Sequence, residues 1–335
     1  MSSRPHVTSI IVTYRDRYKL CAKVVLGCLN EGMDRVIVID NGSTPEVSFA
    51  LDSELTHDPR VVIIRLPSNL GPAGGFKAGI KEATANLNTE FLWFLDDDTV
   101  PENGSLQELL NAACSFGMPK KLCVLYSYRP RWADDKKAIS TGKGKTFPSN
   151  AYCGFTLTEF FAARIKRRAY QHSSFDRGEY DFIKTEMGPY GGLFSHLKTF
   201  EIVGLPNQEF FCYFDDHELS ARINRAGIDQ FIVSRSVLDE IDFTLTAGKG
   251  LFEVKSDFTV FLKVRNQIHL YKKLKTSRVR YNLNKLGFYS LFIAPQIFKG
   301  ALISKVPFWK RLLLIYAAIS DGEKGRLGVP PHLRT

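Results

Sequence analysis

The sequence predicts a doubly wound α/β fold, in which helices cover both faces of a mostly parallel sheet. Short apolar segments alternate with helical segments along the first third of the chain, and this alternation is typical of parallel sheets. The apolar segments contain few polar residues, as expected for strands buried on both faces. One of them, Phe91–Leu95, ends at three consecutive carboxylates, Asp96, Asp97 and Asp98. Open α/β sheets bind ligands at the carboxyl ends of their strands.

Four strands are expected in this part of the chain. Residues 7–13 and 35–40 are rich in Val and Ile, which favour strands. The second of these runs ends at Asp40 and continues into an Asn-Gly-Ser turn. Residues 61–66 and 91–95 are the third and fourth apolar runs.

Three helices are expected between and after these strands. The first covers about residues 20–31 and ends at Gly32. The second follows the glycine-rich turn at residues 71–75 and extends to about residue 86, and the third covers about residues 105–116. Strands and helices in this order form the repeating units of a parallel sheet.

The pattern becomes irregular after this point. Between residues 126 and 186 the sequence is polar and basic, and we expect loops, a hairpin and a helix near residues 158–170. An aromatic strand over residues 209–214 and a helix from 217 to about 226 come next. The remaining elements are a late strand beginning at residue 231 and mostly helical structure after residue 246. The chain is therefore divided into an α/β domain, residues 1–245, and a helical region, residues 246–335.

The positive charge of the chain is concentrated in this helical region. The chain has a net charge of +10, and residues 272–320 contain ten Lys or Arg and no Asp or Glu. Aromatic and aliphatic residues are interleaved with these charges, a composition that suits an anionic membrane surface. One alternative is a helical cap whose basic side is only solvated. Another is nucleic-acid binding, but no recognised motif supports it, and we expect no nucleic-acid partner.

The composition indicates a globular protein of a reducing compartment. Of the 335 residues, 44% are hydrophobic and 24% are charged, which is ordinary for a globular chain. The six cysteines have no paired short spacing, which argues against a zinc site and against a disulfide framework. We find no signal-peptide pattern and no apolar run of about 18 residues. The expected location is cytoplasmic.

The three aspartates at residues 96–98 predict a cation site. Adjacent carboxylates repel one another, so a nearby cation would stabilise them. Mg²⁺ and Mn²⁺ prefer oxygen ligands and often carry the phosphates of a substrate. The alternative is that these aspartates are solvated and cap the next helix, but three in a row behind a buried strand favour the cation site.

Two further features lie at the expected carboxyl edge of the sheet. The glycine-rich turn from Asn69 to Lys77 opens a helix, so its backbone N–H groups could face an anion. It matches neither the dinucleotide fingerprint nor the Walker loop, and a tight strand–helix connection explains it equally well. Asp40 could accept hydrogen bonds from a base or a ribose, although an Asp-Asn-Gly sequence is also ordinary turn chemistry.

A second acidic pair, Asp215 and Asp216, follows the aromatic run. One of the two could be a helix N-cap. A carboxylate beside another carboxylate and aromatic rings has a raised pKa, which is what a general base working near neutral pH needs.

The order of these motifs resembles the family 2 inverting glycosyltransferases of the GT-A fold, in the branch of bacterial rhamnosyl- and galactofuranosyltransferases. The resemblance covers about residues 7–245 well and the tail loosely. The motifs that carry it are Thr13-Tyr14-Arg15, Val38 to Ser43, Asn69 to Phe76, Leu95 to Asp98, Gly191-Gly192, Phe214-Asp215-Asp216 and Ser320 to Arg326. The fold that it implies is a GT-A, Rossmann-like domain with a mostly parallel sheet flanked by helices, followed by the C-terminal basic helical region.

The resemblance implies a nucleotide-sugar donor site and a metal site. The residues implied for the donor are Thr13, Arg15, Asp40, Asn69, Gly71, Gly75, Asp96 and Asp97. Mn²⁺ or Mg²⁺ would be held by Asp96 and Asp98. The family often adds a histidine after the late strand, but this chain has Leu238-Asp239-Glu240-Ile241-Asp242 there. Asp239, Glu240 or Asp242 would then complete the metal site.

The resemblance also implies catalytic and acceptor residues. Asp216 would be the general base, with Asp215 beside it. The acceptor sugar would meet Gly191, Gly192, Tyr190 and Trp132. Candidate stacking platforms for this sugar are Trp132, Tyr190, Tyr213 and Phe210, although core packing is the commoner role of such rings. The implied reaction is inverting transfer of galactofuranose or rhamnose, from UDP-galactofuranose or dTDP-rhamnose, to a lipid-linked glycan of a bacterial surface polysaccharide such as O-antigen. The enzyme would be peripheral on the inner face of the cytoplasmic membrane.

Two other functions are compatible with the sequence. A sugar nucleotidyltransferase would need a glycine-rich loop with a basic partner near the first strand, for which Arg15 and Arg17 are the only candidates. A catalytically silent sugar-binding or scaffold protein would not need Asp216. The sequence identifies neither the donor nor the oligomeric state, and it allows a homo-oligomer.

Overall fold

The computed structural model describes residues 4–85, 88–166, 180–242, 251–303, 307–330 and 333. The end of the helix expected near residues 158–170 and the start of the helical region after residue 246 lie partly outside these ranges. No helix among the described residues is long and apolar enough to cross a bilayer.

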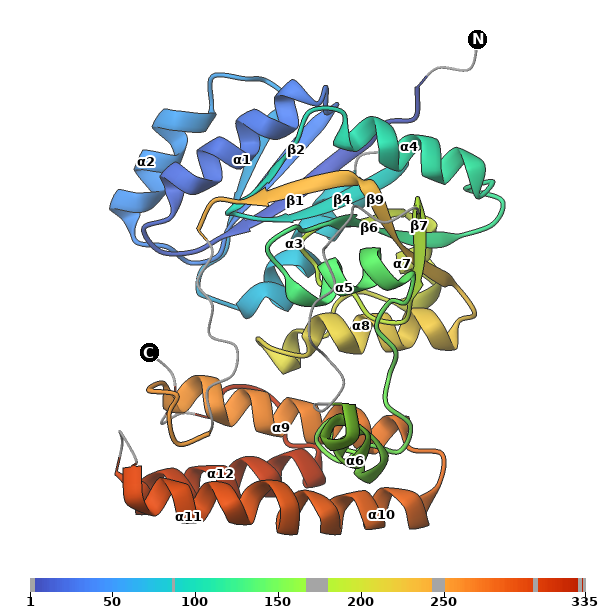
Figure 1. Ribbon diagram of the computed structural model, residues 1–335. Coiled ribbons are helices and arrows are strands. Elements are labelled where there is room, and N and C mark those ends of the chain that lie inside the picture. The colour runs from blue at the N-terminus through green and yellow to red at the C-terminus, as the bar shows by residue number, and fades with distance from the viewer. Residues whose placement is uncertain are drawn as a thin grey trace. The chain divides into compact units, whose positions relative to one another are not determined.

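The described residues form a mixed α/β structure with a nine-stranded sheet. The strand order is β3-β2-β1-β4-β8-β6-β9-β5, and β7 also pairs with β9 (Figure 1). The strands are β1 (Val7–Thr13), β2 (Arg35–Asp40), β3 (Val61–Arg65), β4 (Phe91–Asp96), β5 (Thr99–Pro101), β6 (Cys123–Tyr128), β7 (Phe182–Thr185), β8 (Leu193–His196) and β9 (Asp229–Glu240). The fold class predicted from the sequence is therefore confirmed.

Helices follow most of the strands. They are α1 (Tyr18–Asn30), α2 (Pro45–Leu55), α3 (Gly71–Ala85), α4 (Ser105–Ser115), α5 (Ala133–Thr141), α6 (Leu157–Lys166), α7 (Lys198–Val203), α8 (Asp215–Arg225), α9 (Asp257–Leu274), α10 (Arg278–Gly287), α11 (Ala294–Ile303) and α12 (Phe308–Lys324). A 3₁₀ turn, η1 (Gln208–Phe210), precedes α8, and a π-helical turn, η2 (Phe288–Ile293), joins α10 to α11.

Strands β3, β2, β1 and β4 are parallel to one another. Their carboxyl ends therefore meet at one edge of the sheet. Strand β8 is antiparallel to both β4 and β6, and β6 is parallel to β9. The sheet is thus mostly parallel where the acidic residues leave it.

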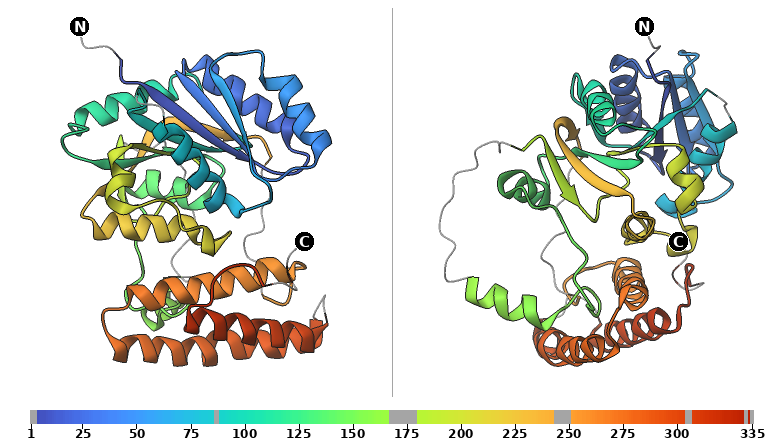
Figure 2. Two further views of the ribbon diagram at one scale, coloured as in Figure 1. Left: turned by 180° about the vertical axis from the view of Figure 1, so that it is seen from behind. Right: turned by 90° about the vertical axis from the view of Figure 1, so that its right-hand side faces the viewer.

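Helices cover both faces of the sheet, as the unbroken apolar strands predict (Figures 1 and 2). On one face, Val24 of α1 and Leu109 of α4 pack with alternate strand residues such as Ile11. On the other face, Phe76 of α3 and Leu219 of α8 form a second apolar cluster.

The expected aromatic strand at residues 209–214 is absent from the structure. The segment forms the turn η1 and then an irregular loop, in which Phe211, Tyr213 and Phe214 have φ values of 66°, 67° and 62°. This left-handed backbone is incompatible with a strand. The prediction was wrong because aromatic residues favour strands only where the backbone can extend.

Contacts divide the chain into two compact units. Unit 1 contains residues 1–146, 175–211 and 215–243, and unit 2 contains residues 147–174, 212–214 and 244–335. Residues 147–166, which the sequence places in the α/β domain, thus belong to unit 2. Asn150 ties it there, because its Oδ1 accepts hydrogen bonds from the backbone N–H groups of Thr276 at 2.9 Å and Ser277 at 2.6 Å.

Unit 2 is built around α9 and α12. Gly322 of α12 lies against Ile268 of α9, where a Cβ would come within 3.0 Å of the Ile268 side chain. Arg311 is almost fully buried and donates to the carbonyl oxygens of Leu251 and Val254 and to the carboxylate of Asp257. One of the ten basic residues of the C-terminal region therefore has a structural role inside unit 2.

Candidate active site

Polar residues from three parallel strands meet at the carboxyl edge of the unit 1 sheet. Thr13 ends β1 opposite Asp40, which ends β2, and Asp96 ends β4 opposite Val12. The short strand β5 then pairs antiparallel with the end of β9, and the N–H of Ile241 donates to the carbonyl of Asp98 at 2.9 Å. This pairing brings the acidic end of β9 beside the three aspartates.

Arg17 is the cation that the structure places among these carboxylates. Its Nε is 2.8 Å from Asp97 Oδ1, its Nη2 is 2.8 Å from Asp98 Oδ2, and its Nη1 is 2.6 Å from Asp242 Oδ2. Burial alone would lower the pKa of Arg17, but the three carboxylates raise it above its ordinary value. The guanidinium therefore stays charged and holds the acidic cluster together.

Asp97 is the most firmly held of the three aspartates. Besides Arg17, it accepts a hydrogen bond from Thr13 Oγ1 at 2.8 Å, and its side chain is mostly buried. Burial raises its pKa to about 6, against the opposing effect of Arg17 and Thr13. Thr13 and Asp97 thus brace the end of β1 against the end of β4.

Asp96 is arranged differently. Among the described residues, its carboxylate has no hydrogen bond or ion pair, and it lies against the backbone of Gly191, where a Cβ would come within 2.2 Å of Asp96 Oδ2. Burial raises its pKa to about 7, and the neighbouring carboxylate of Asp98 adds to this effect. Asp96 is therefore the aspartate whose oxygens are available to a ligand.

The acidic residues at the end of β9 differ in the direction they face. Glu240 is buried and accepts a hydrogen bond from Trp132 Nε1 through Oε1, whereas its Oε2 is buried with no hydrogen-bond partner. Burial raises the pKa of Glu240. Asp239 is half-exposed and pairs with Arg131 at 3.3 Å. Because successive side chains of a strand alternate in direction, Asp239 is not a candidate metal ligand, which corrects the expectation from the sequence.

The donor atoms at this edge fit a hard divalent cation only in part. Asp96 and the unpartnered Oε2 of Glu240 are oxygen donors of the kind that Mn²⁺ and Mg²⁺ take. Asp98 and Asp242 are engaged by Arg17, and among the described residues no three His, Cys, Asp or Glu side chains form a metal-binding group. Arg17 contacts Asp98 through Oδ2, so a metal ion on Asp98 would lie beside a competing positive charge.

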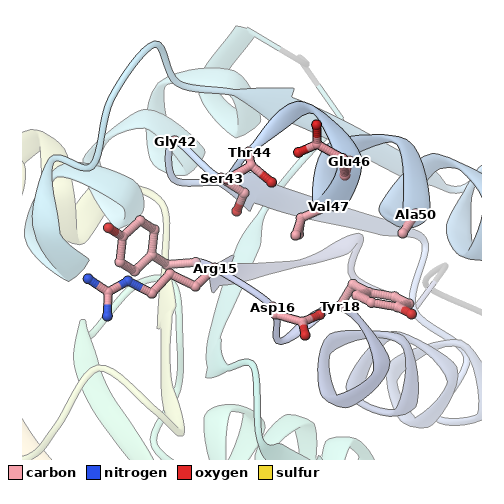
Figure 3. A pocket seen from close by; sticks show the side chains of 10 residues that line it. Arg15, Asp16, Tyr18, Gly42, Ser43, Thr44, Glu46, Val47 and Ala50 are labelled. Atoms are coloured by element: carbon pink, nitrogen blue, oxygen red, sulfur yellow. The ribbon is translucent and has the colours of Figure 1, made fainter.

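A pocket with a cavity volume of about 580 Å³ opens beside this edge, between the ends of β1 and β2 (Figure 3). Its size is in the usual range for small-molecule sites. Arg15 is one of its lining residues, with a left-handed backbone (φ 62°), and its guanidinium lies 5.0 Å from the centre of the Tyr14 ring. The lining residues are Tyr14, Arg15, Asp16, Tyr18, Gly42, Ser43, Thr44, Glu46, Val47 and Ala50.

Asp40 shapes this pocket from behind. It is buried, and its carboxylate accepts hydrogen bonds from the N–H of Ser43 at 3.0 Å and from the hydroxyl of Ser48. Asp40 thereby fixes the turn that forms one wall of the pocket. In this arrangement both of its oxygens have protein partners, so the structure supports a positioning role.

The glycine-rich turn is built for close packing. Asn69 Oδ1 accepts the N–H of Gly71 at 2.8 Å, and Asn41 Oδ1 accepts the N–H of Leu70 at 2.9 Å. Gly71 has φ 72°, and a Cβ there would lie 2.0 Å from the carbonyl oxygen of Phe211. A Cβ at Gly75 would lie 2.6 Å from the side chain of Val12. Close packing against Phe211 and Val12 therefore explains both glycines without an anion-binding role.

Asp215 and Asp216 begin α8, directly after the left-handed loop. Asp215 is 4% exposed, and its Oδ2 has no hydrogen-bond partner. Burial, with the charges of Asp216 and Asp96, raises the pKa of Asp215 well above its ordinary value. Asp216 is more exposed, and its Oδ1 accepts the N–H of His217 at 2.7 Å. Asp216 is thus the more accessible acid of the pair.

The expected acceptor platforms are only partly supported. Tyr190 is 5% exposed, its ring lies tilted against Phe76 with 4.8 Å between the ring centres, and its hydroxyl donates to the Asp215 carbonyl. Its ring is therefore a core residue, which corrects the expectation. Phe210 is also fully buried. Trp132 is 40% exposed, but its Nε1 donates to Glu240 and the Arg129 guanidinium lies 4.6 Å from the centre of its ring. Gly192 has φ 98°, a conformation that favours glycine, and its N–H donates to the carbonyl of Phe94 in β4. Both observations give Gly192 a structural role.

Tyr213 belongs to unit 2. Its hydroxyl is 3.2 Å from the hydroxyl of Thr259, and the ammonium of Lys263 lies 4.8 Å from the centre of its ring. These contacts hold the ring within unit 2.

The chain matches the family model of glycosyl transferase family 2 over residues 9–172. It is 26% identical over 226 residues to the galactofuranosyltransferase GlfT1 of Mycolicibacterium smegmatis, a match that spans 66% of each protein. It is 32% identical over 89 residues to an uncharacterized glycosyltransferase of Haemophilus influenzae, which covers 26% of this chain and 34% of that relative. The chain thus spans about two thirds of the first relative and about one third of the second.

Two solved structures share the fold. TarS 1-349 of S. aureus has a TM-score of 0.50 at 11% identity, over 95% of this chain and 80% of that chain. GalNAc-T7, solved with UDP, GalNAc and Mn²⁺, has a TM-score of 0.53 at 14% identity, over 88% of this chain and 58% of that chain. Together with the mostly parallel sheet and the acidic edge described above, these matches place residues 9–172 in glycosyl transferase family 2 and show that the chain has a GT-A fold.

Proposed function

We propose that this protein transfers a sugar from a nucleotide-sugar donor to a hydroxyl group of a glycan acceptor, with inversion at the anomeric carbon. Membership of family 2 supports glycosyl transfer. The observation that carries the proposal is the joint placement of a ligand-sized pocket, an unpaired Asp96 and the accessible Asp216 in one compact unit.

The donor nucleotide fits the pocket between β1 and β2. The base would lie against the turn that Asp40 fixes, and the positive side chain of Arg15 would attract the diphosphate. Thr13 and Asp97 would act from behind, by holding the ends of β1 and β4 in register. The sugar would then extend toward Asp96.

The chemistry needs a base and a stabilised leaving group. Asp216 would remove the proton from the acceptor hydroxyl as that oxygen attacks the anomeric carbon. Asp215 would act as its buried neighbour, whose raised pKa keeps a second negative charge away from Asp216 at neutral pH. Asp96, Glu240 and Asp98 would hold Mn²⁺ or Mg²⁺, which would supply positive charge for the diphosphate leaving group.

Two donors fit this proposal, UDP-galactofuranose and dTDP-rhamnose. Similarity to a galactofuranosyltransferase favours the first. The acceptor would be a lipid-linked glycan of a bacterial surface polysaccharide, reached from the cytoplasmic face of the membrane.

A panel of sugar nucleotides tests the donor site. With Mn²⁺ present, we expect UDP-galactofuranose or dTDP-rhamnose to raise the melting temperature of the full chain, because a ligand that binds only the folded state stabilises it. Purine-linked sugars should have little effect. Replacing Ser43 by Phe should fill the pocket and abolish the shift. An unchanged shift in this variant would contradict the location of the donor site.

Unit 2 supports the proposed membrane surface. On α10, Val279, Leu283 and Leu286 recur at helical spacing and are 70%, 52% and 66% exposed. On α12, Trp309, Leu313 and Tyr316 have the same spacing and are 73%, 68% and 72% exposed. We call these two rows the apolar stripes. Contiguous exposed apolar residues of this kind mark interaction sites.

The charges beside the apolar stripes favour an anionic lipid surface as the partner. Arg278 and Arg280 on α10 are exposed, and the Lys310 side chain on α12 is 73% exposed. The stretch 272–320 has no acidic residue. Basic residues flanking exposed apolar side chains are typical of helices that lie on anionic membranes.

Vesicle binding tests this surface. We expect the full chain to bind vesicles of phosphatidylglycerol and phosphatidylcholine, and salt to weaken the binding. The double variant Leu283→Ser/Leu286→Ser should lose roughly tenfold or more in affinity, since two apolar side chains no longer enter the lipid. The control is Ile202→Ser, which removes a 61% exposed apolar side chain from α7 in unit 1. Equal binding by the double variant and the control would contradict a membrane-binding role of the apolar stripes and would indicate that the helical region only caps the fold.

A further inference from the structure

Arg17 forms three ion pairs inside the acidic cluster, and this arrangement is not accounted for by the proposed reaction. Its guanidinium contacts Asp97, Asp98 and Asp242 through three different nitrogen atoms, at 2.8, 2.8 and 2.6 Å. Asp97 and Asp98 follow β4, and Asp242 follows β9, while Arg17 precedes α1. The fold of unit 1 therefore brings three segments that are distant in sequence into contact at Arg17.

The cluster remains electrically unbalanced. One guanidinium faces three carboxylates, and Asp96 lies beside them without a hydrogen bond or ion pair among the described residues. Glu240 adds a buried oxygen, Oε2, that has no hydrogen-bond partner. A second guanidinium, that of Arg129, lies 4.0 Å from Glu240 Oε1. The Asp96 carboxylate and Glu240 Oε2 are thus the oxygens open to a cation, while Arg17 binds Asp98 through Oδ2.

We infer that Arg17 is an internal competitor of the divalent cation: its guanidinium binds Asp98 Oδ2 in the free protein, and its positive charge opposes a metal ion that Asp96, Glu240 and Asp98 would hold. The inference rests on the proposed function for its biological role, because release of Arg17 would couple metal binding to arrival of the donor. The diphosphate of the donor is a natural new partner for a released guanidinium. The free protein would then bind the metal ion weakly, and the metal site would stay empty until the donor binds.

The test measures Mn²⁺ binding to the full chain in the absence of any nucleotide. Electron paramagnetic resonance gives the concentration of free Mn²⁺ at each point of the titration. We expect weak binding to the unaltered protein. Arg17→Ala should bind Mn²⁺ roughly tenfold or more tightly, because it frees three carboxylates from a competing positive charge. Arg17→Lys should fall between the two, since an ammonium keeps the charge but cannot bridge three carboxylates as a planar fork does.

The matched control is Arg131→Ala. It also removes an arginine from an aspartate of β9, but Asp239 faces away from the cluster. We expect no change in Mn²⁺ affinity for this variant. If Arg17→Ala does not fold, Arg17→Lys still tests the inference, because it keeps a positive charge in the cluster and should bind Mn²⁺ more tightly than the unaltered protein.

Two results would overturn the inference. One is equal Mn²⁺ affinity in the unaltered protein and both Arg17 variants. The other is weaker binding by the variants, which would make Arg17 a support of the metal site. Because no sugar nucleotide is present, neither result depends on whether the protein transfers a sugar. Failure of the proposed function would appear separately, as the absence of stabilisation by any sugar nucleotide.

Discussion

Replacing Asp216 by Asn is expected to lower kcat by about 10²–10⁴-fold, the usual effect of removing a general base. Asn has nearly the same shape but cannot take the proton of the acceptor hydroxyl. Donor affinity should stay within about twofold, because Asp216 begins α8 and lines no part of the donor pocket. The measurement is transfer kinetics together with the dissociation constant of the donor.

Two comparisons sharpen this prediction. Glu209→Gln removes an exposed carboxylate from the turn just before α8 and should leave kcat unchanged. Asp215→Asn should reduce kcat less than Asp216→Asn, since the Asp215 carboxyl is buried and its raised pKa favours the neutral form. The reverse order of the two effects would assign the base to Asp215.

Replacing Gly191 by Ala is expected to weaken donor binding by roughly tenfold or more, a loss that corresponds to about 1.4 kcal/mol. A Cβ at this position would come within 2.2 Å of Asp96 Oδ2, a distance that real structures do not show. The Asp96 carboxylate would have to leave its place at the end of β4. Isothermal titration of the donor in the presence of Mn²⁺ measures the effect.

A double-mutant cycle with Asp96→Ala gives the control. If Gly191→Ala acts by displacing the Asp96 carboxylate, it should add little to the loss in a chain that already lacks this carboxylate. Fully additive effects of the two substitutions would show that Gly191 acts by another route, such as a change in the path of the chain before β8.

The fold was predictable where local pattern and tertiary structure agree. Strands β1 and β2 have the bounds that their apolar runs indicate, because burial on both faces leaves little room for polar residues. Helix α2 was missed, although Thr44 at its N-cap, Pro45 at its first position and Glu46 in its first turn are standard start signals. The error at residues 209–214 has a different origin, because backbone conformation there overrides side-chain preference.

The candidate site was predictable in part for the same reason. The acids at the ends of β4 and β9 could be found, since they interrupt apolar strands. Arg17 could not be recognised as their partner, because it lies 80 residues before Asp97 and only the fold brings the two together. Tyr190 looked like a sugar platform, but its position under α8 makes it part of the core.

The most direct test of the account is transfer itself. The full chain is incubated with the sugar nucleotide that stabilises it best and with a synthetic lipid-linked glycan, and the product is examined by mass spectrometry and proton NMR. The account predicts an acceptor that is longer by one sugar, with the anomeric configuration opposite to that of the donor, and no such product with Asp216→Asn. Retained configuration, or equal product from the Asp216→Asn variant, would contradict it.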